Sequence, residues 1–207
     1  MNVLTHAAVL DDHCLFADSF ALLLQREGIA DIVQGFSQTD HFFQFLRSFG
    51  RSEIYIYLDY YFPKENGLAL MIEIKRINDK AKVIFVTRAV APAVIRTILQ
   101  YRPNGLLSKS SDIQEVITCI DTIKKGKTYV SKSFAKLLSA NKELGAFTPR
   151  ELELLQYFAR GISIADTASK LFLSRHTVVA HRRKMMQKTN SHSIAQLLTY
   201  ARDNALI

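Results

Sequence analysis

The chain has 207 residues, a formal net charge of +8, 48% hydrophobic residues and only two cysteines. This length suits two domains, and no apolar run approaches the roughly 18 residues that a membrane-spanning helix needs. The first residues do not resemble a secretory signal, and Cys14 and Cys119 fit neither a metal-binding spacing nor a disulfide framework. We therefore expect a cytoplasmic protein with free thiols.

The charge is divided unevenly along the chain. Residues 1–126 hold 14 Lys and Arg against 14 Asp and Glu, whereas residues 127–207 hold 13 against 5. The whole excess of positive charge therefore belongs to the C-terminal part. Such asymmetry indicates either a domain that meets a polyanion or simply a solvated basic surface, and charge alone does not separate the two.

Residues 1–126 alternate short apolar strands with helical stretches. Strands are expected at Ala7–Leu10, Ile32–Phe36, Ile54–Leu58, Lys82–Thr87 and Gly105–Ser108. Helices are expected at Phe16–Arg26, Thr39–Ser48, Leu68–Ile77, Pro92–Tyr101 and Asp112–Lys125. Continuous apolar strands are typical of parallel strands that are buried on both faces. This part therefore predicts an α/β domain with a doubly wound, five-stranded parallel sheet.

Residues 127–146 predict a linker with one short helix, which Ser131 caps, which extends to about Asn141 and which Gly145 follows. Residues 147–207 predict only helices. They are expected from Thr148 to Arg160 and at Ile164–Leu171, Arg175–Thr189 and Ser193–Asn204. A short helix, a tight connection and a longer basic helix are typical of a helix-turn-helix, so this part predicts a small, all-α domain of four helices.

Five polar residues stand at the expected ends of strands: Asp11, Asp12, Asp59, Thr87 and Lys109. In a doubly wound sheet they converge on one edge, where the crowded carboxylates favour an oxygen-liganded Mg²⁺. Asp59 is then a nucleophile for a phosphoryl group, while Lys109 offsets the developing charge and Thr87 hydrogen-bonds a phosphoryl oxygen. One strand-end Asp is more often only a helix cap, but the combination is hard to obtain by chance.

Four segments resemble the receiver domains of two-component systems, which have a flavodoxin-like fold. They are VLDDH at 9–13, LDYYFPKENG at 58–67, FVT at 85–87 and LLSK at 106–109. The resemblance implies that Asp59 is the phosphoacceptor and that Asp11, Asp12 and the backbone carbonyl of Tyr61 hold Mg²⁺ together with Asp59. It also implies that Thr87 and Lys109 stabilise the phosphorylated state, and that a sensor histidine kinase is the donor.

The sequence departs from the receiver pattern near two functional positions. Arg88 follows Thr87 where a small residue is usual, and Leu106 stands where the family has a switch aromatic. Arg102 and Pro103 also replace a common Gly-Ala. These departures leave an alternative open: a DNA-binding regulator that does not depend on phosphorylation, or that forms heterodimers, with a degenerate receiver switch.

The stretch Phe147–Thr189 is similar to the LuxR-type helix-turn-helix of the NarL/FixJ family. On its third helix, Val178, Met185 and Met186 are expected to face the core. The residues expected at double-stranded DNA are Ser174, Arg175, His176, Thr177, Val179, Ala180, Arg182, Arg183, Lys184 and Lys188. The arginines suit guanine edges and the lysines suit phosphates.

One departure concerns the operator: Val179 stands where the family commonly has a base-reading lysine, so no familiar operator sequence is expected. The resemblance also implies a homodimer, at least in the active state.

An enzymatic alternative is a Mg²⁺-dependent phosphohydrolase of haloacid-dehalogenase type. Such an enzyme needs a second Asp two residues after the nucleophile, and here that residue is Tyr61. We therefore do not expect an enzyme beyond self-phosphorylation and slow self-dephosphorylation. His13 and His41 lack metal-ligand partners at a useful sequence spacing, so we expect no role for them in metal binding.

Overall fold

The chain forms two compact units in the structure, a computed structural model that describes residues 4–63, 66–88, 91–140, 146–204 and 206–207. One unit comprises residues 1–88 and 102–135, and the other comprises residues 89–101 and 136–207. The predicted domain limits, at residues 126 and 146, do not coincide with the limits of these two units, and they stay a prediction.

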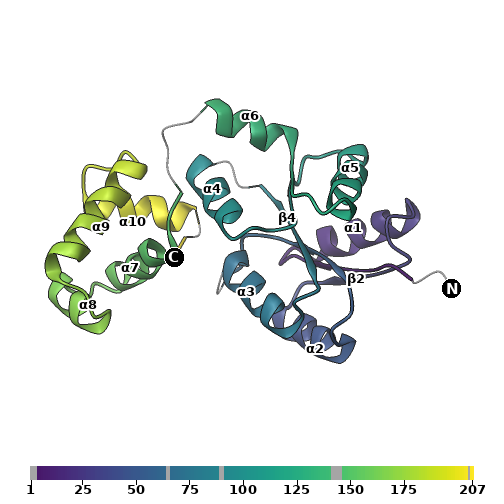
Figure 1. The fold of residues 1–207 in the computed structure, drawn as a ribbon, viewed down its shortest axis with the longest axis horizontal. Helices are drawn as coiled ribbons and strands as arrows, with labels where there is room; N and C mark the ends of the chain where they lie inside the picture. The colour runs from purple at the N-terminus through teal and green to yellow at the C-terminus, as the bar shows by residue number, and fades with distance from the viewer. Residues whose placement is uncertain (1–3, 64–65, 89–90, 141–145, 205) are drawn as a thin grey trace. The chain divides into compact units, whose positions relative to one another are not determined.

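The first unit is built on a parallel sheet (Figure 1). Its strands are β1 (His6–Leu10), β2 (Ile32–Phe36), β3 (Tyr55–Leu58), β4 (Lys82–Thr87), β5 (Gly105–Ser108) and β6 (Tyr129–Val130). They lie in the order β2-β1-β3-β4-β5-β6, and every neighbouring pair is parallel. The predicted doubly wound α/β fold is confirmed, because the order of the strands reverses at β1.

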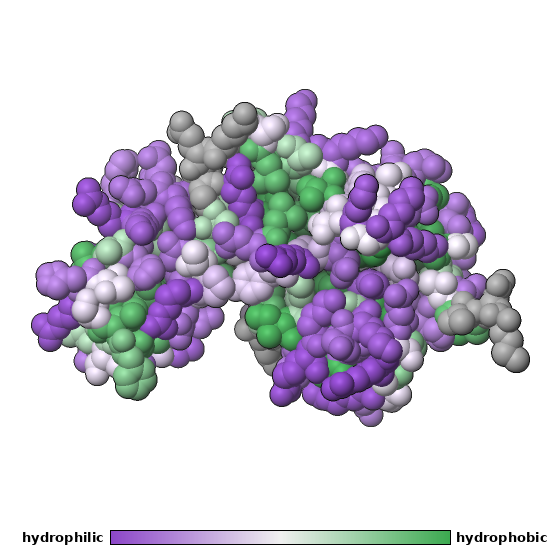
Figure 2. Space-filling model, in the orientation of Figure 1, coloured by the Kyte–Doolittle hydropathy of each residue, from purple (hydrophilic) through white to green (hydrophobic). Residues whose placement is uncertain are grey.

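Helices cover both faces of this sheet, which explains why the central strands β1, β3 and β4 are buried and mainly apolar, whereas the edge strand β2 is largely exposed. They are α1 (Cys14–Arg26), α2 (Thr39–Phe49), α3 (Gly67–Ile77) and α5 (Ile113–Lys124). Residues of α1 and α5 share one buried core with β1, β3 and β4, and Figure 1 shows α2 and α3 on the opposite side. On the face that Figure 2 shows, hydrophilic residues cover most of the surface.

The expectation of five strands was one strand short. Tyr129–Val130 pairs with Gly105–Leu106 of β5, and Ser131 N donates to Leu106 O at 2.8 Å. A strand of two residues is too short to show any periodicity, so its sequence indicates only two apolar residues. It forms because the unpaired edge of β5 offers hydrogen-bonding partners.

The second unit is helical. It holds α4 (Pro92–Gln100), α7 (Pro149–Ala159), α8 (Ile164–Lys170), α9 (Arg175–Lys188) and α10 (Ile194–Asp203), and α6 (Lys132–Ala140) continues into it from the first unit. Within this unit, Phe147 N donates to Thr97 Oγ1 of α4 at 3.0 Å. The four predicted C-terminal helices are confirmed to within one residue at each end. Asn141 and Gly145 of the predicted linker lie outside the described residues.

Side chains cap the helices of the helix-turn-helix part. Thr148 and Glu151 form the predicted capping box at the start of α7. Ser163 caps α8 and Ser174 caps α9, each by accepting a hydrogen bond from a backbone N–H three residues later. In the described part of the chain, none of the helices is long and apolar enough to cross a membrane.

Candidate functional site

Three carboxylates meet at the carboxyl ends of β1 and β3. These strands are neighbours, with Leu10 opposite Leu58, and Asp59 N donates to Leu10 O at 2.9 Å. Asp11 and Asp59 therefore follow their strands side by side. One ligand atom each from Asp11, Asp12, His13 and Asp59 lies within 4.8 Å of all the others.

Lys109 reaches this cluster from the end of β5. Its Nζ lies 2.5 Å from Asp11 Oδ2 and 2.8 Å from Asp59 Oδ2, and its side chain is only 5% exposed. The ammonium also lies over the ring of Phe16, 4.6 Å from the ring centroid. The long side chain spans the width of β4, so a lysine fifty residues away in sequence becomes a direct partner of Asp59.

Burial dominates the electrostatics of Asp59, whose side chain is 3% exposed. Loss of solvent raises the pKa of Asp59, and the charge of Asp11 raises it further. The hydrogen bonds from Lys109 and from Tyr60 N lower the pKa, but they do not cancel the effect of burial. A carboxylate that is poorly hydrated and held at both oxygens is well suited to nucleophilic attack.

The cluster fits a small divalent cation. Asp12 Oδ1 is buried, its close polar neighbour is His13 Nδ1 at 2.8 Å, and the neighbouring oxygens come from the carboxylates of Asp11 and Asp59. Hard cations such as Mg²⁺ take ligands of this kind. The structure brings the predicted Asp11, Asp12 and Asp59 together, and their role as ligands of Mg²⁺ stays a prediction. The backbone carbonyl of Tyr61 stays a predicted fourth ligand.

His13 shows that one expectation was wrong. We expected no metal-ligand partners for this histidine, yet its Nδ1 lies 2.8 Å from Asp12 Oδ1 and 3.3 Å from Asp11 Oδ1. Spacing rules consider partners several residues apart, whereas here the chain turns sharply before α1 and groups three consecutive side chains. The sequence signal that could have indicated this contact is that His13 directly follows Asp11 and Asp12.

Gly67 is a second residue that the sequence reasoning left without a role. A Cβ at this position would clash with the backbone oxygen of Asp59 and would lie 2.7 Å from Cε1 of Phe85. Gly67 N also donates to Tyr60 O at 2.7 Å. The start of α3 therefore packs directly beneath Asp59, and only glycine fits there.

The remaining residues of the receiver pattern differ in their exposure. Thr87 is fully buried at the end of β4, and its backbone oxygen accepts from Lys109 N at 3.0 Å. Arg88 is exposed, whereas Leu106 is fully buried in β5. The position of the usual switch aromatic is thus a core position in this chain.

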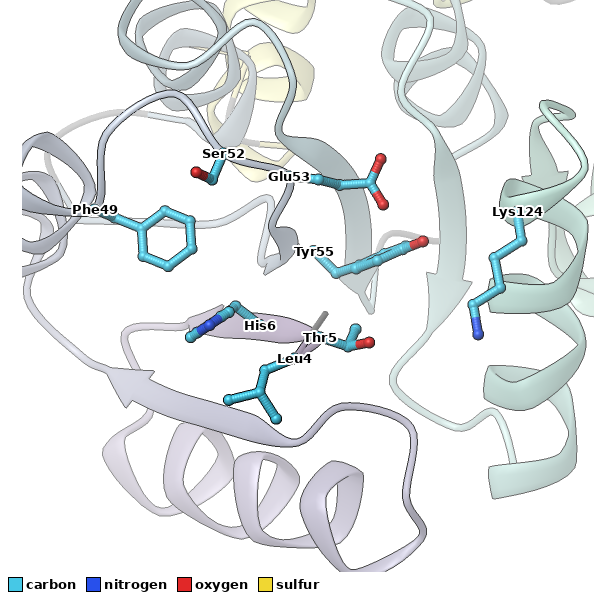
Figure 3. Close-up of a pocket in the computed structure, with 8 residues that line it drawn as sticks. All are labelled: Leu4, Thr5, His6, Phe49, Ser52, Glu53, Tyr55 and Lys124. Carbon is cyan, nitrogen blue, oxygen red and sulfur yellow. The ribbon is translucent and has the colours of Figure 1, made fainter. Parts of the chain in front are cut away.

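A separate cavity of about 540 Å³ opens at the other end of the sheet. Figure 3 shows the residues that line it: Leu4, Thr5, His6, Phe49, Ser52, Glu53, Tyr55 and Lys124. It lies at the amino ends of β1 and β3, whereas the carboxylates lie at their carboxyl ends. Among the described residues that line it, Glu53 is the one carboxylate, and it already pairs with Lys82 at 3.7 Å. Burial raises the pKa of Tyr55, and the charge of Glu53 raises it further.

The exposed face of α9 carries the second candidate site. Val178 and Met185 are fully buried as predicted, and Met186 is half-buried. Most of the residues predicted at DNA stand at the start of this helix or on its other faces. Among them Ser174, Arg175, His176, Val179, Ala180, Arg183 and Lys184 are exposed, and Thr177 and Arg182 are half-buried.

Lys188, the last of the residues predicted at DNA, is instead engaged in contacts within the domain. Its Nζ donates at 2.5 Å both to Glu151 Oε2 and to Ala146 O, and it lies 5.7 Å from the centre of the Phe147 ring. Glu151 is only 3% exposed. The ammonium of Lys188 therefore ties α9 to the start of α7, and we do not include it among the side chains available to DNA.

Comparison with known proteins identifies the family of each of the two domains. The family described as "Response regulator receiver domain" matches residues 7–121, and "Bacterial regulatory proteins, luxR family" matches residues 145–201. The Fimbriae Z protein of Escherichia coli (strain K12) is 28% identical and covers 98% of this chain and 99% of its own. The oxygen regulatory protein NreC of Staphylococcus carnosus is 24% identical over 96% of this chain and 97% of its own.

Solved structures share the fold. The two-component response regulator RcsB in its complex with DNA has a TM-score of 0.66 at 22% identity, covering 97% of this chain and 98% of its own. RcsB of Salmonella enterica serovar Typhimurium, bound to promoter rprA with the phosphomimetic BeF3⁻, has a TM-score of 0.66 at 20% identity, covering 95% and 98%. With the receiver family matching more than half of its residues, this chain belongs to the two-component response regulators that join a receiver domain to a LuxR-type helix-turn-helix domain.

Proposed function

We propose that this chain is a transcriptional regulator whose binding to double-stranded DNA is switched by phosphorylation of Asp59. A sensor histidine kinase is the phosphoryl donor, and both act in the cytoplasm. The receiver domain spans residues 1–126, a linker spans residues 127–146 and the DNA-binding domain spans residues 147–207. The observation that carries the proposal is the direct contact of Lys109 with both Asp59 and Asp11 inside a buried carboxylate cluster.

In the transfer step, a carboxylate oxygen of Asp59 attacks the phosphorus of a phosphohistidine. The new P–O bond forms an acyl phosphate, the P–N bond breaks, and the leaving imidazole takes a proton from solvent. Lys109 offsets the negative charge at the attacking carboxylate, and the Thr87 hydroxyl hydrogen-bonds the transferred group. Asp11, Asp12, Asp59 and the backbone carbonyl of Tyr61 would hold Mg²⁺, which would supply positive charge to the phosphoryl oxygens.

The DNA-binding step uses α9 as the recognition helix. Arg175, Arg182 and Arg183 suit the edges of guanines in the major groove, while the methyl groups of Val179 suit a thymine methyl. Lys184 and the N-terminus of the helix at Ser174 are placed to contact phosphates. RcsB binds DNA as dimers in one of the solved structures, and we propose a homodimer here, in which two copies of α9 meet two half-sites.

Phosphorylation controls DNA binding by shifting the population between two conformations of the protein. The acyl phosphate at Asp59 favours the conformation that dimerises, and the dimer holds two helices at a fixed spacing. The alternative regulator, which does not depend on phosphate, has the buried Leu106 and the exposed Arg88 in its favour. The experiment below separates the two.

The test combines mass spectrometry with a DNA-binding titration. Incubation with acetyl phosphate and Mg²⁺ is expected to add one phosphoryl group to the Asp59 peptide and to raise both dimer content and DNA affinity. D59N is expected to abolish all three effects, whereas D40N, a change on the exposed surface of α2, is expected to retain them. Equal DNA affinity and equal dimer content with and without the donor would refute the switch.

A further inference from the structure

The most exposed large apolar residue in the described part of the chain stands in the turn of the helix-turn-helix. Phe172 lies between α8 and α9 and is 96% exposed, more than Leu15 at 82% or Leu22 at 68%. A single exposed apolar side chain is ordinary on a protein surface, so its exposure alone decides nothing. Its backbone conformation is the second observation.

Phe172 has a φ of 53°, in the left-handed region of backbone conformation that residues other than glycine and asparagine rarely adopt. Two hydrogen bonds fix this conformation at the end of α8. Phe172 N donates to Ser169 O at 3.2 Å, and Leu173 N donates to Ala168 O at 2.8 Å. This pair of bonds is the Schellman motif, in which the residue at the position of Phe172 is usually glycine.

Neither packing nor backbone geometry therefore accounts for a phenylalanine here. The ring is exposed to water on nearly its whole surface, and the backbone would be less strained with glycine. Strained residues that bury nothing are characteristic of sites where binding, rather than stability, fixes the residue type.

The surroundings of Phe172 are basic. Lys170 precedes it by two residues and Arg175 follows it by three, and both are exposed. Ser174, which caps α9, follows Phe172 by two residues, so the N-terminus of α9, the positive end of its helix dipole, is also close in sequence. Charge of this sign favours a polyanion over an apolar or basic partner surface.

We propose that the ring of Phe172 packs against the sugar–phosphate edge of the DNA groove that α9 enters. This inference rests on the DNA-binding function proposed above. Deoxyribose offers an apolar surface between phosphates, and an aromatic ring covers a large area while losing little conformational entropy. Since every nucleotide carries the same sugar, the contact adds affinity and helps to fix the orientation of α9 without reading sequence.

The test replaces Phe172 in the full chain and measures DNA affinity together with thermal stability. The probe is a pool of short random-sequence duplexes at low salt. F172G and F172N accept the left-handed backbone, so they are expected to melt no lower than the unchanged protein, yet to bind DNA at least about fivefold more weakly. F172Y keeps the ring and is expected to bind within about twofold of the unchanged protein.

Equal DNA affinity of F172G and the unchanged protein would overturn the proposal. If the affinity were equal but transcription by purified RNA polymerase fell, Phe172 would contact a protein, which also overturns it. A failure of the unchanged protein to bind any duplex would instead defeat the DNA-binding function itself, so the two failures are distinguishable.

Discussion

Replacing Glu151 by glutamine removes one buried charge from the helix-turn-helix domain while preserving the shape of the side chain. In the structure Glu151 Oε2 accepts hydrogen bonds from Lys188 Nζ at 2.5 Å and from Thr148 N at 2.7 Å. Glutamine can still accept from Thr148 N, so the capping box survives in E151Q. The expected loss of stability therefore comes from the ammonium of Lys188, which no longer faces a carboxylate.

The magnitude follows from the burial of the two partners. Removing one member of a buried ion pair costs about 3–5 kcal/mol. Lys188 is 20% exposed and keeps the carbonyl of Ala146 as an acceptor, so part of this cost is recovered by water and by that hydrogen bond. We expect E151Q to lower the free energy of unfolding by about 2 kcal/mol, which for a domain of this size lowers Tm by about 8–16 °C.

The assay is thermal unfolding of the full chain, followed by circular dichroism. The matched control is E153Q on the same helix, because Glu153 is 43% exposed and its pair with Arg150 lies at the surface. Such surface pairs contribute little, so E153Q should change the stability by less than about 0.5 kcal/mol. Equal stability losses in E151Q and E153Q would show that the Glu151–Lys188 pair does not hold α9 against α7.

Three further predictions concern the two sites. Burial raises the pKa of Asp59 above its value in the unfolded chain, so the stability that the protonated Asp59 side chain contributes is lost as pH rises through the folded pKa. In thermal unfolding without metal, D59N should therefore be more stable than the unchanged protein at pH 7, and the difference in stability should shrink toward pH 4. G67A should displace the Asp59 backbone and slow phosphorylation by acetyl phosphate at least about tenfold, measured by mass spectrometry, while an unchanged rate would contradict the packing beneath Asp59. In DNA titrations against salt concentration, K184M should reduce the slope of log affinity against log salt by about 0.9, whereas K188M should leave it unchanged; equal slopes in the two variants would contradict the internal role of Lys188.

The local sequence was sufficient for the order and type of the elements. Apolar runs predicted β2, β4 and β5 at their observed limits, and Thr148 with Pro149 predicted the start of α7. These signals depend on neighbouring residues: a strand buried on both faces, such as β4, is mainly apolar, and a helix end needs side-chain caps. β6 was not predicted because its two residues become a strand only by pairing with β5.

The sequence by itself determined which side chains stand at strand ends and which face of α9 is basic, because both follow from periodicity along the chain. Only the tertiary structure decided the partners of each charge. In the structure His13 lies beside the carboxylates, Gly67 packs beneath Asp59, and Lys188 pairs with Glu151 instead of lying on the exposed face of α9. These contacts join residues through space, across distances that depend on how helices and strands pack, and no local pattern records such distances.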